Sequence, residues 1–436
     1  MRRCKVGVLV TILLGSLLAG TAKAEITLFK SQGGWDFYTE GRLGAFTELV
    51  EGDRYPDGTD PTTGVQLYSI GDGGISINGD PMVLSNGAVR NGPIGASRVR
   101  SGFLGNILAF GLRRKLTEDT TIKGYLSIWA TAETDSERKY LPDLPDEREG
   151  YLQIQGPAGS LLVGRALTLY SRGATEIDFL YAHRYGVGNP AGFSSLGPSG
   201  GQIGYGVLAA GFSAGVVYAT PLFHGLQLTA GYYDPSTLVG LYWNRTKFGR
   251  PEAELTYDMP FGDLVRVHLF LNGAWQKLYT TSTSQNVTVY GGGAGGRLEI
   301  GAFHLGVAGH SGKGLGLDYS FDSSTSIFNS NSPQQLRDFD GLYVQTQVVL
   351  GKFDLSAGWG ETRVHEVAAD VDPTYFVNGS PATSVLKDQI GINAGVVYHI
   401  SENLHFDIDY FRAEANWWLG DKQVVNTYNS GMTLTW

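Results

Sequence analysis

Residues 404–410 read Leu-His-Phe-Asp-Ile-Asp-Tyr, and this stretch carries the pattern that decides the fold. Apolar and polar residues alternate one by one, so their side chains point to opposite sides of an extended chain. The same alternation recurs in stretches of about 8 to 16 residues, which predicts β-strands, and no segment after residue 24 keeps a helical period. Further apolar faces of this kind are Ile122, Leu126, Ile128 and Ala130; Ala253, Leu255, Tyr257 and Met259; and Ile390, Ile392, Ala394, Val396 and Tyr398.

The end of the chain, residues 427–436, follows the same pattern and stops on an aromatic carboxy terminus. One face is mainly apolar, and the other is built of small polar residues that suit contact with water. The apolar face is Tyr428, Ser430, Met432, Leu434 and Trp436, and the polar face is Thr427, Asn429, Gly431, Thr433 and Thr435. The sequence therefore predicts a last strand that separates an apolar medium from a water-filled interior.

The connections between these strands alternate between short turns and long loops. The short ones are 117–120, 156–159, 220–225, 259–263, 301–302, 351–352 and 401–403. The long ones are 50–98, 135–148, 167–202, 234–250, 281–288, 318–338, 365–386 and 418–423. Seven turns and eight loops join sixteen strands, and transmembrane barrels of the outer membrane combine short periplasmic turns with long extracellular loops and an even strand number.

A closed antiparallel barrel explains this arrangement better than a soluble sheet does. Closure pairs every strand, which satisfies all backbone groups in a lipid that offers no hydrogen bonds. A soluble β-sandwich or propeller remains the alternative, but the 412 residues after residue 24 would normally divide into two or more such domains. No linker divides them. We therefore expect one barrel domain, residues 25–436.

The first 24 residues have the features of a cleaved signal peptide. Basic residues precede an apolar run, 6–18, and small residues stand at Ala22 and Ala24, where signal peptidase needs them. The apolar run is shorter than the roughly 20 residues that a spanning helix requires, although an N-terminal anchor is the alternative. Cleavage after Ala24 would place the mature chain outside the cytoplasm, and we expect the outer membrane of a Gram-negative cell.

Charge and cysteine content exclude several classes of function. The chain has 33 Lys and Arg against 42 Asp and Glu, a net charge of −9, and loss of four basic residues with the signal leaves −13. Such an acidic chain is a poor candidate for binding nucleic acid. The single cysteine, Cys4, lies in the signal, so the mature chain has no disulfide or thiolate metal site. The eight histidines show no ligand spacing, and we expect no metal and no cofactor.

Two motifs that suggest enzymes are better explained as parts of strands. Residues 211–215 match the Gly-x-Ser-x-Gly nucleophile elbow, but a strand and not a helix is expected to follow. Residues 291–296 match Gly-x-Gly-x-x-Gly, yet no helix follows to bind a phosphate. We expect no catalytic residue and no enzymatic activity.

Several short motifs, in their order along the chain, resemble the Gram-negative general porins. Residues 25–38 resemble the amino terminus of that family, in which a short segment pairs with the last strand. Residues 100–105 resemble its Arg-x-Gly-Phe-x-Gly motif, and 162–165 resemble the Gly-Arg that opens the third loop. Residues 431–436 resemble its terminal strand, and Trp436 resembles the signal that the outer-membrane assembly machinery reads. The likeness covers essentially the whole mature chain.

The resemblance implies a passive, water-filled channel for small hydrophilic solutes and ions. It further implies a homotrimer in outer-membrane lipid and a third loop, about 167–202, that folds into the barrel and narrows it. This loop lacks the acidic Pro-Glu-Phe-Gly-Gly stretch of enteric porins, and Tyr151 stands where many of them carry an arginine.

Facing rows of opposite charge would create a transverse field that orders water and favours dipolar solutes. We expect a basic wall that includes Arg42 and Arg100 to face Glu176 and Asp178 of the third loop. Each charge could equally be a solvated position without a role in selectivity, because any such lumen is polar. The candidate pore residues are Tyr38, Glu40, Arg42, Arg98, Arg100, Arg165, Arg172, Glu176, Asp178 and Arg266.

Three alternatives to a general channel remain. A channel specific for sugars or anions would need a line of aromatic or basic residues, to which Tyr125, Trp129, Tyr151 and Tyr185 could contribute. A barrel enzyme would need a catalytic dyad, and Ser213 has no evident partner. A soluble secreted β-protein would need no detergent for extraction. The sign of ion preference stays open between the net acidity and the basic wall.

Overall fold

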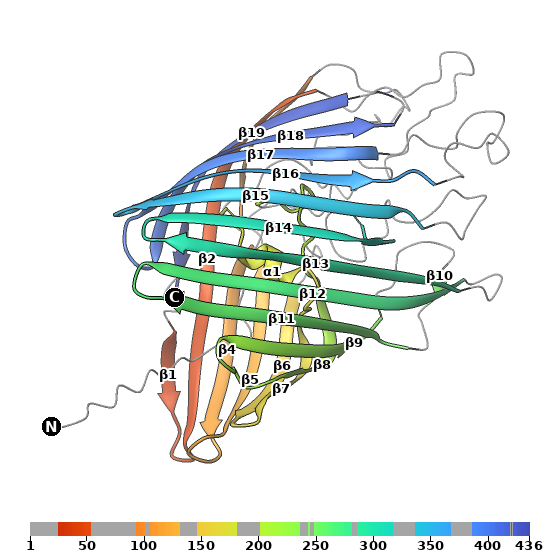
Figure 1. Ribbon diagram of the computed structural model, residues 1–436. Helices are drawn as coiled ribbons and strands as arrows, with labels where there is room; N and C mark the ends of the chain where they lie inside the picture. Colours follow the sequence, from red (N-terminus) through yellow and green to blue (C-terminus); the bar gives the residue numbers. More distant parts are fainter. Residues whose placement is uncertain are drawn as a thin grey trace, which may run out of the picture.

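The computed structural model describes residues 25–53, 93–101, 105–130, 146–180, 201–235, 243–244, 248–280, 286–316, 336–367, 386–418, 420 and 422–436. The expected signal peptide and the cleavage site at Ala24 lie outside these residues, and so do His183, Arg184 and Tyr185 of the third loop. Nearly all described secondary structure is antiparallel β-sheet (Figure 1). Among the described residues, no helix is long and apolar enough to cross a membrane.

The strands in chain order are β1 (Ile26–Lys30), β2 (Trp35–Gly52), β3 (Ile94–Arg100), β4 (Asn106–Lys115), β5 (Thr121–Ala130), β6 (Asp146–Gly156), β7 (Gly159–Leu167), β8 (Phe212–Ala219), β9 (Leu226–Tyr233), β10 (Trp243–Asn244), β11 (Arg250–Phe261), β12 (Val265–Thr280), β13 (Asn286–Ile300), β14 (Phe303–Lys313), β15 (Asp338–Leu350), β16 (Phe353–Val364), β17 (Leu386–His399), β18 (Leu404–Trp417) and β19 (Lys422–Thr435). The helix α1 (Arg172–Glu176) follows β7.

The strands close into a barrel of sixteen positions, as the sequence predicted. Consecutive strands pair with one another, and β19 returns to pair with β2 from Val425 opposite Gly52 to Thr435 opposite Arg42. The segments β3 and β4 both pair with β2, and β10 and β11 both pair with β12, so each couple forms one interrupted strand. The short strand β1 is the remaining segment. It pairs with residues 36–39 of β2, next to the stretch of β2 that pairs with β19. The resemblance implied pairing with the last strand instead, and this expectation is wrong.

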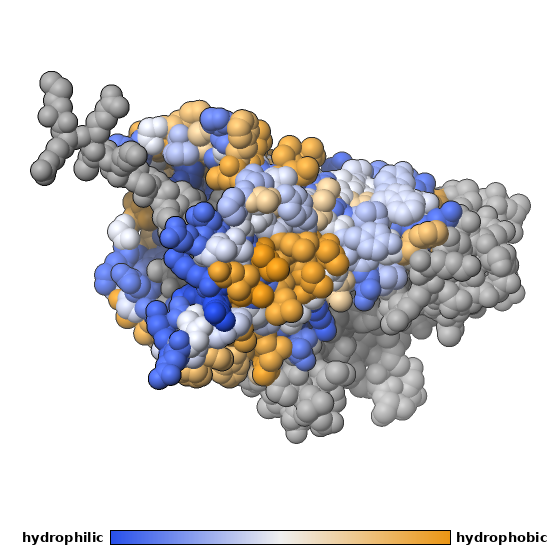
Figure 2. All heavy atoms as spheres, turned by 90° about the horizontal axis from the view of Figure 1, so that it is seen from below, coloured by the Kyte–Doolittle hydropathy of each residue, from blue (hydrophilic) through white to orange (hydrophobic). Residues whose placement is uncertain are grey.

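Side chains on the strands divide as the alternation predicted. On β18 the odd-numbered residues His405, Asp407 and Asp409 are buried, whereas Ile408 of the other row is exposed. The outward rows of many described strands carry large apolar side chains, and hydrophobic patches are visible on the face of the barrel shown in Figure 2. Apolar patches of this extent are unfavourable in water, so this surface fits a lipid bilayer.

The seam between the two ends of the chain is closed by a glycine and the terminal tryptophan. The amide of Gly41 donates to the carbonyl oxygen of Trp436 at 2.7 Å, and the amide of Trp436 donates back at 3.1 Å. A Cβ at position 41 would overlap the indole ring of Trp436 and lie 2.6 Å from the carbonyl oxygen of Ile107. The ring of Trp436 can therefore lie across β2 only because residue 41 has no side chain.

We expect Gly41→Leu to prevent closure of the barrel. The leucine would displace Trp436 and separate β19 from β2, which would leave unpaired backbone groups in the membrane. The folded fraction, measured as the heat-modifiable band on gel electrophoresis, should fall by a large factor. Gly95→Leu is the matched control, because a Cβ at Gly95 has no neighbour within 4 Å. Equal folded fractions in the two variants would contradict this role of Gly41.

Candidate pore constriction

The described parts of the segment between β7 and β8, residues 168–180 and 201–211, turn into the barrel instead of running over its rim. Its helix α1 contacts β12 and β13 (Figure 1). The amide of Phe179 donates to Gln345 Oε1 of β15 at 2.6 Å, and the amide of Gly206 donates to Thr362 Oγ1 of β16 at 2.8 Å. We name the described residues 168–180 and 201–211 the inner loop. Strand β8 begins at Phe212, so this connection runs nine residues beyond the expected end at 202.

Glycines on the inner wall make room for the inner loop. On β17, a Cβ at Gly391 would lie 2.7 Å from Cβ of Tyr205, and one at Gly395 would lie 2.9 Å from Leu180. On β16, a Cβ at Gly360 would overlap the carbonyl oxygen of Tyr205. We name the inward glycines against which the loop packs the glycine belt: Gly291, Gly306, Gly360, Gly391 and Gly395. Their missing side chains explain why the wall can accept a second layer of backbone.

Two neighbouring carboxylates on β11 fix the start of the inner loop. Glu252 Oε2 accepts hydrogen bonds from the amides of Leu169 at 2.8 Å and Tyr170 at 2.7 Å. Its other oxygen accepts from Nε of Arg250 at 2.7 Å, so the buried carboxylate has a cationic partner. Two residues further along the same inward row, Glu254 forms an ion pair with Arg172 of α1. We name Glu252 and Glu254 the carboxylate clamp.

Within the inner loop, Asp178 has a structural position. Its side chain accepts hydrogen bonds from the amide of Leu180 at 3.0 Å and from the amide of Gln202 at 2.6 Å. These contacts join the two described arms of the loop across residues 181–200. Asp178 is 8% exposed, and its carboxylate holds the two described arms of the loop together.

Apolar side chains fill the space between the inner loop and the wall. Tyr205 and Leu208 of the loop pack with Phe411 and Trp417 of β18, and all four are at most 1% exposed. A second cluster joins Ile177 and Val207 of the loop to other inward side chains, Trp129, Phe270, Ala308 and Tyr343. The described parts of the loop are thus seated in a dry interface, which is unusual for a lumen that must hold water.

Opposite the clamp, β2 carries the residues that the sequence selected. Tyr38, Glu40 and Arg42 are buried on the inward row of this strand. Arg42 and Glu176 belong to opposite walls, because β12, against which α1 packs, is eight strand positions from β2 in the ring of sixteen. The walls are not of single sign, however. Glu40 and Glu48 share the row of Arg42, and Arg172 lies 3.7 Å from Glu176.

The remaining candidates differ in where they lie. Arg98 and Arg100 are in register with the inward residues Glu48 and Phe46, and their side chains are outside the described part of the structure. Arg165 is exposed on the outward row of β7, together with Leu161 and Val163. Side chains alternate along a strand and Leu162 points inward, so Arg165 points outward and not into the pore as expected. Arg266 is on the inward row of β12, directly after the turn that follows β11. Its side chain is 65% exposed, so it lies at the end of the barrel and not at the constriction.

Lys123, which no sequence motif marks, contacts several aromatic rings on the wall beside β2. The Nζ atom of Lys123 lies 4.5 Å from the ring centre of Tyr125, 5.7 Å from that of Tyr151 and 5.9 Å from that of Tyr38. The hydroxyl of Tyr125 donates to Glu40 Oε1 at 2.7 Å. These aromatic residues are therefore brought together in one buried group, at 2–7% exposure.

The motifs set aside in the sequence occur in strands. Residues 212–215 open β8, and residues 291–296 lie within β13, where Gly291 belongs to the glycine belt. Among the described residues, no group of three or more His, Cys, Asp or Glu could hold a metal ion. Glu252 and Glu254 were visible as the polar face of an alternating strand, but no sequence signal tied them to the inner loop.

Comparison with known proteins agrees with this architecture. Residues 10–434 match the family described as Gram-negative porin. No curated protein sequence matches the chain. The outer membrane channel DcaP of Acinetobacter baumannii superposes with a TM-score of 0.63 at 14% identity, covering 94% of this chain and 100% of that one. The anion-selective porin from Comamonas acidovorans gives 0.57 at 12%, covering 92% and 100%.

A third similar structure is the trimer form of OmpT, an outer membrane protein of Vibrio cholerae. It superposes with a TM-score of 0.51 at 15% identity and covers 92% of this chain and 100% of that one. At these identities the structures show the fold, whereas the family match spans nearly the whole chain. The closed barrel with its inner loop and the family match together establish that this chain belongs to the Gram-negative porins.

Proposed function

We propose that the inner loop is the constriction of an outer-membrane diffusion channel, through which small hydrophilic solutes and ions pass. The family match and the fold support a diffusion channel in the outer membrane, and they favour a channel over an enzyme. The constriction is proposed because the carboxylate clamp fixes the start of the inner loop to β11. Helix α1 is thereby held against the wall that lies across the ring from Arg42. A loop fixed in this way narrows the lumen from one side without moving.

The proposal includes the assembly of the channel. Cleavage after Ala24 would release a mature chain, and Trp436 would serve as the signal for the assembly machinery. A homotrimer is supported by family membership and by the trimer form of the similar OmpT structure. The opposite charges within each wall support a general pore, and they argue against a strongly anion-selective one.

Single-channel conductance of the refolded protein in a planar bilayer tests the proposal. Discrete steps in groups of three, with a reversal potential set by a salt gradient, would support a trimeric diffusion pore. A correctly folded, heat-modifiable barrel that carried no current would overturn it and would bring a closed barrel or a barrel enzyme forward.

The selectivity of the pore should depend on pH through Glu176. Burial inside the barrel raises the pKa of the Glu176 carboxyl above its usual range, and the Glu254 carboxylate adds to the rise against the opposing effect of Arg172. With 34% of its side chain exposed, Glu176 still contacts the aqueous path. Because the pKa is raised, Glu176 takes up its proton at a higher pH than an ordinary glutamate does, and its negative charge is lost as the pH falls through the raised pKa.

We therefore expect acidification from about pH 7 to about pH 4 to shift the reversal potential in a salt gradient towards anion preference. In Glu176→Gln this shift should be clearly smaller. Glu118→Gln, in the exposed turn between β4 and β5, is the matched control and should titrate like the unmodified protein. Identical titrations of all three proteins would show that Glu176 does not face the ion path.

A further inference from the structure

Two histidines lie side by side on the hairpin of β17 and β18, at the end of the barrel that carries the short turns (Figure 1). Short turns mark the periplasmic end of such a barrel. His399 ends β17 and is directly opposite His405 of β18, across the turn at residues 400–403. Their ring centres are 4.7 Å apart, and their ring planes are nearly perpendicular, at 87°. We name His399 and His405 the histidine pair.

A carboxylate on the neighbouring strand determines which nitrogen of His399 carries a proton. Nε2 of His399 lies 2.8 Å from Oδ2 of Asp354 on β16. Because an ionised carboxylate only accepts hydrogen bonds, Nε2 donates, and the lone pair of the neutral ring is on Nδ1. Metal-binding histidines are held in this way, with the second ring nitrogen bonded to a carboxylate. Nδ1 of His399 is therefore prepared to bind a metal ion.

The separation of the two rings fits a shared metal ion. With metal–nitrogen bonds of about 2.0 Å, two imidazoles at neighbouring corners of a square plane have ring centres about 4.5 Å apart. At a tetrahedral ion, the same two ring centres lie about 5.1 Å apart. The observed 4.7 Å is nearer to the square-planar value. Cu²⁺ prefers this geometry and binds nitrogen ligands more tightly than the other first-row divalent ions do, so the pair favours Cu²⁺.

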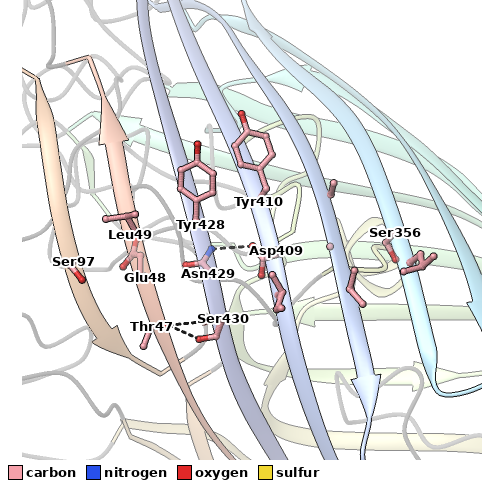
Figure 3. A pocket seen from close by; sticks show the side chains of 15 residues that line it. Thr47, Glu48, Leu49, Ser97, Ser356, Asp409, Tyr410, Tyr428, Asn429 and Ser430 are labelled. Carbon is pink, nitrogen blue, oxygen red and sulfur yellow. Dashed lines mark hydrogen bonds between the residues drawn. The ribbon is translucent and has the colours of Figure 1, made fainter.

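Carboxylates near the histidine pair supply negative charge for a cation. Asp407 and Asp409 follow His405 on the inward row of β18, and both side chains are buried. Figure 3 shows Asp409 bonded to Asn429 of β19, whose Nδ2 atom donates to Oδ1 of Asp409 at 3.0 Å. With Asp354, these carboxylates form an acidic wall that runs from the histidine pair into the lumen. An acidic wall attracts divalent cations and disfavours anions.

The histidine pair is open to water on the side of His399. The side chain of His399 is 33% exposed and that of Asp354 is 19% exposed, whereas His405 is 4% exposed and lies below them. Lys352, a cation of the adjoining turn, donates from Nζ to the carbonyl oxygen of Ile400 at 3.4 Å. An ion that enters from the periplasm meets His399 first. The pair supplies two protein ligands, fewer than the groups of three that the described residues lack.

We propose that the histidine pair binds one Cu²⁺ ion at the periplasmic mouth of the barrel. Nδ1 of His399 and one ring nitrogen of His405 occupy neighbouring positions on the ion, and water occupies the others. Asp354 orients His399, and Asp407 balances part of the positive charge. The site lies outside the constriction and requires no ion flow, so the inference goes beyond the channel function proposed above.

Electron paramagnetic resonance with added Cu²⁺ tests the site on the mature, untagged protein folded in detergent. One equivalent of Cu²⁺ should give a spectrum split by two imidazole nitrogens. His399→Gln should lose one of these nitrogens and weaken Cu²⁺ binding by roughly tenfold or more. His268→Gln is the matched control and should bind Cu²⁺ like the unmodified protein. His268 also faces the lumen and lies 2.6 Å from Asp258, but the residues opposite it are Asp258 and Arg297.

A second variant leaves both histidines in place and so keeps the test valid if a histidine variant fails to fold. Asp354→Asn should weaken Cu²⁺ binding by roughly tenfold and retain the splitting by two nitrogens. The heat-modifiable band on gel electrophoresis confirms that each variant is folded. Splitting by one nitrogen or none in the unmodified protein would overturn the inference, and so would equal Cu²⁺ affinities of His399→Gln and His268→Gln. Conductance plays no part in these measurements, so their failure leaves the channel proposal standing.

Discussion

Replacing Gly360 by valine is expected to reduce single-channel conductance to roughly half or less, with the barrel itself intact. A Cβ at this position overlaps the carbonyl oxygen of Tyr205, which is backbone and cannot rotate away. The turn at Tyr205 lies between the wall and the open lumen, so it can move only into the pore. It would also lose the hydrogen bond from Gly206 to Thr362 and that from Gln389 to the carbonyl oxygen of Gly204.

The control for Gly360→Val is Gly292→Val on β13. Gly292 points outward, and its nearest neighbour to a new Cβ is the carbonyl oxygen of Asn272 at 3.7 Å. Both variants add the same β-branched residue to a strand, so only the contact with the inner loop differs. Unchanged conductance in Gly360→Val would show that the turn is not seated at this wall, and an increase would show that the loop had left the lumen.

Replacing Glu252 by leucine is expected to release the start of the inner loop from β11. The amides of Leu169 and Tyr170 would lose their acceptor, and each buried amide left unsatisfied costs about 1–3 kcal/mol. That cost corresponds to roughly a ten- to hundredfold rise in the hydrogen-exchange rate of these two amides. Open-channel current noise should rise with it, because a loosened loop fluctuates in the ion path.

Thr256→Leu is the matched control for Glu252→Leu. Thr256 lies on the same strand and the same inward row, and its replacement introduces the same leucine. The amides of Leu169 and Tyr170 donate to Glu252 and not to Thr256, so their exchange should be unaffected. If these two amides stayed protected from hydrogen exchange in Glu252→Leu, apolar contacts alone would be holding the loop.

Local pattern was sufficient for the strands and their order. The alternation in residues 404–410 and 252–259 is reproduced in the structure because the side-chain period of a strand is two, and a slip by one residue would turn an entire row to the wrong medium. Arg165 lies on the outward row, and its expected pore position came from the resemblance and not from strand parity.

The charged site was less accessible to sequence reasoning. Arg42 and Glu176 were selected, and they lie on opposite walls. The partners of the loop were missed, because Glu254 is 82 residues away from Arg172 in the chain and shares no local pattern with it. Asp178 was expected to face the pore, but its carboxylate accepts two backbone amides of its own loop.

The sequence by itself determined which residues face lipid, which face the interior, and that sixteen strands must close upon one another. These properties depend on periodicity and on the length of connections, both of which are local. Only the tertiary structure decided where the inner loop lies, because its seat combines glycines from β13, β14, β16 and β17 with carboxylates from β11. A glycine has no side chain, so the sequence does not indicate what packs against it. Its role can be identified only from the tertiary structure, in which the backbone of the inner loop occupies the space that a side chain would fill.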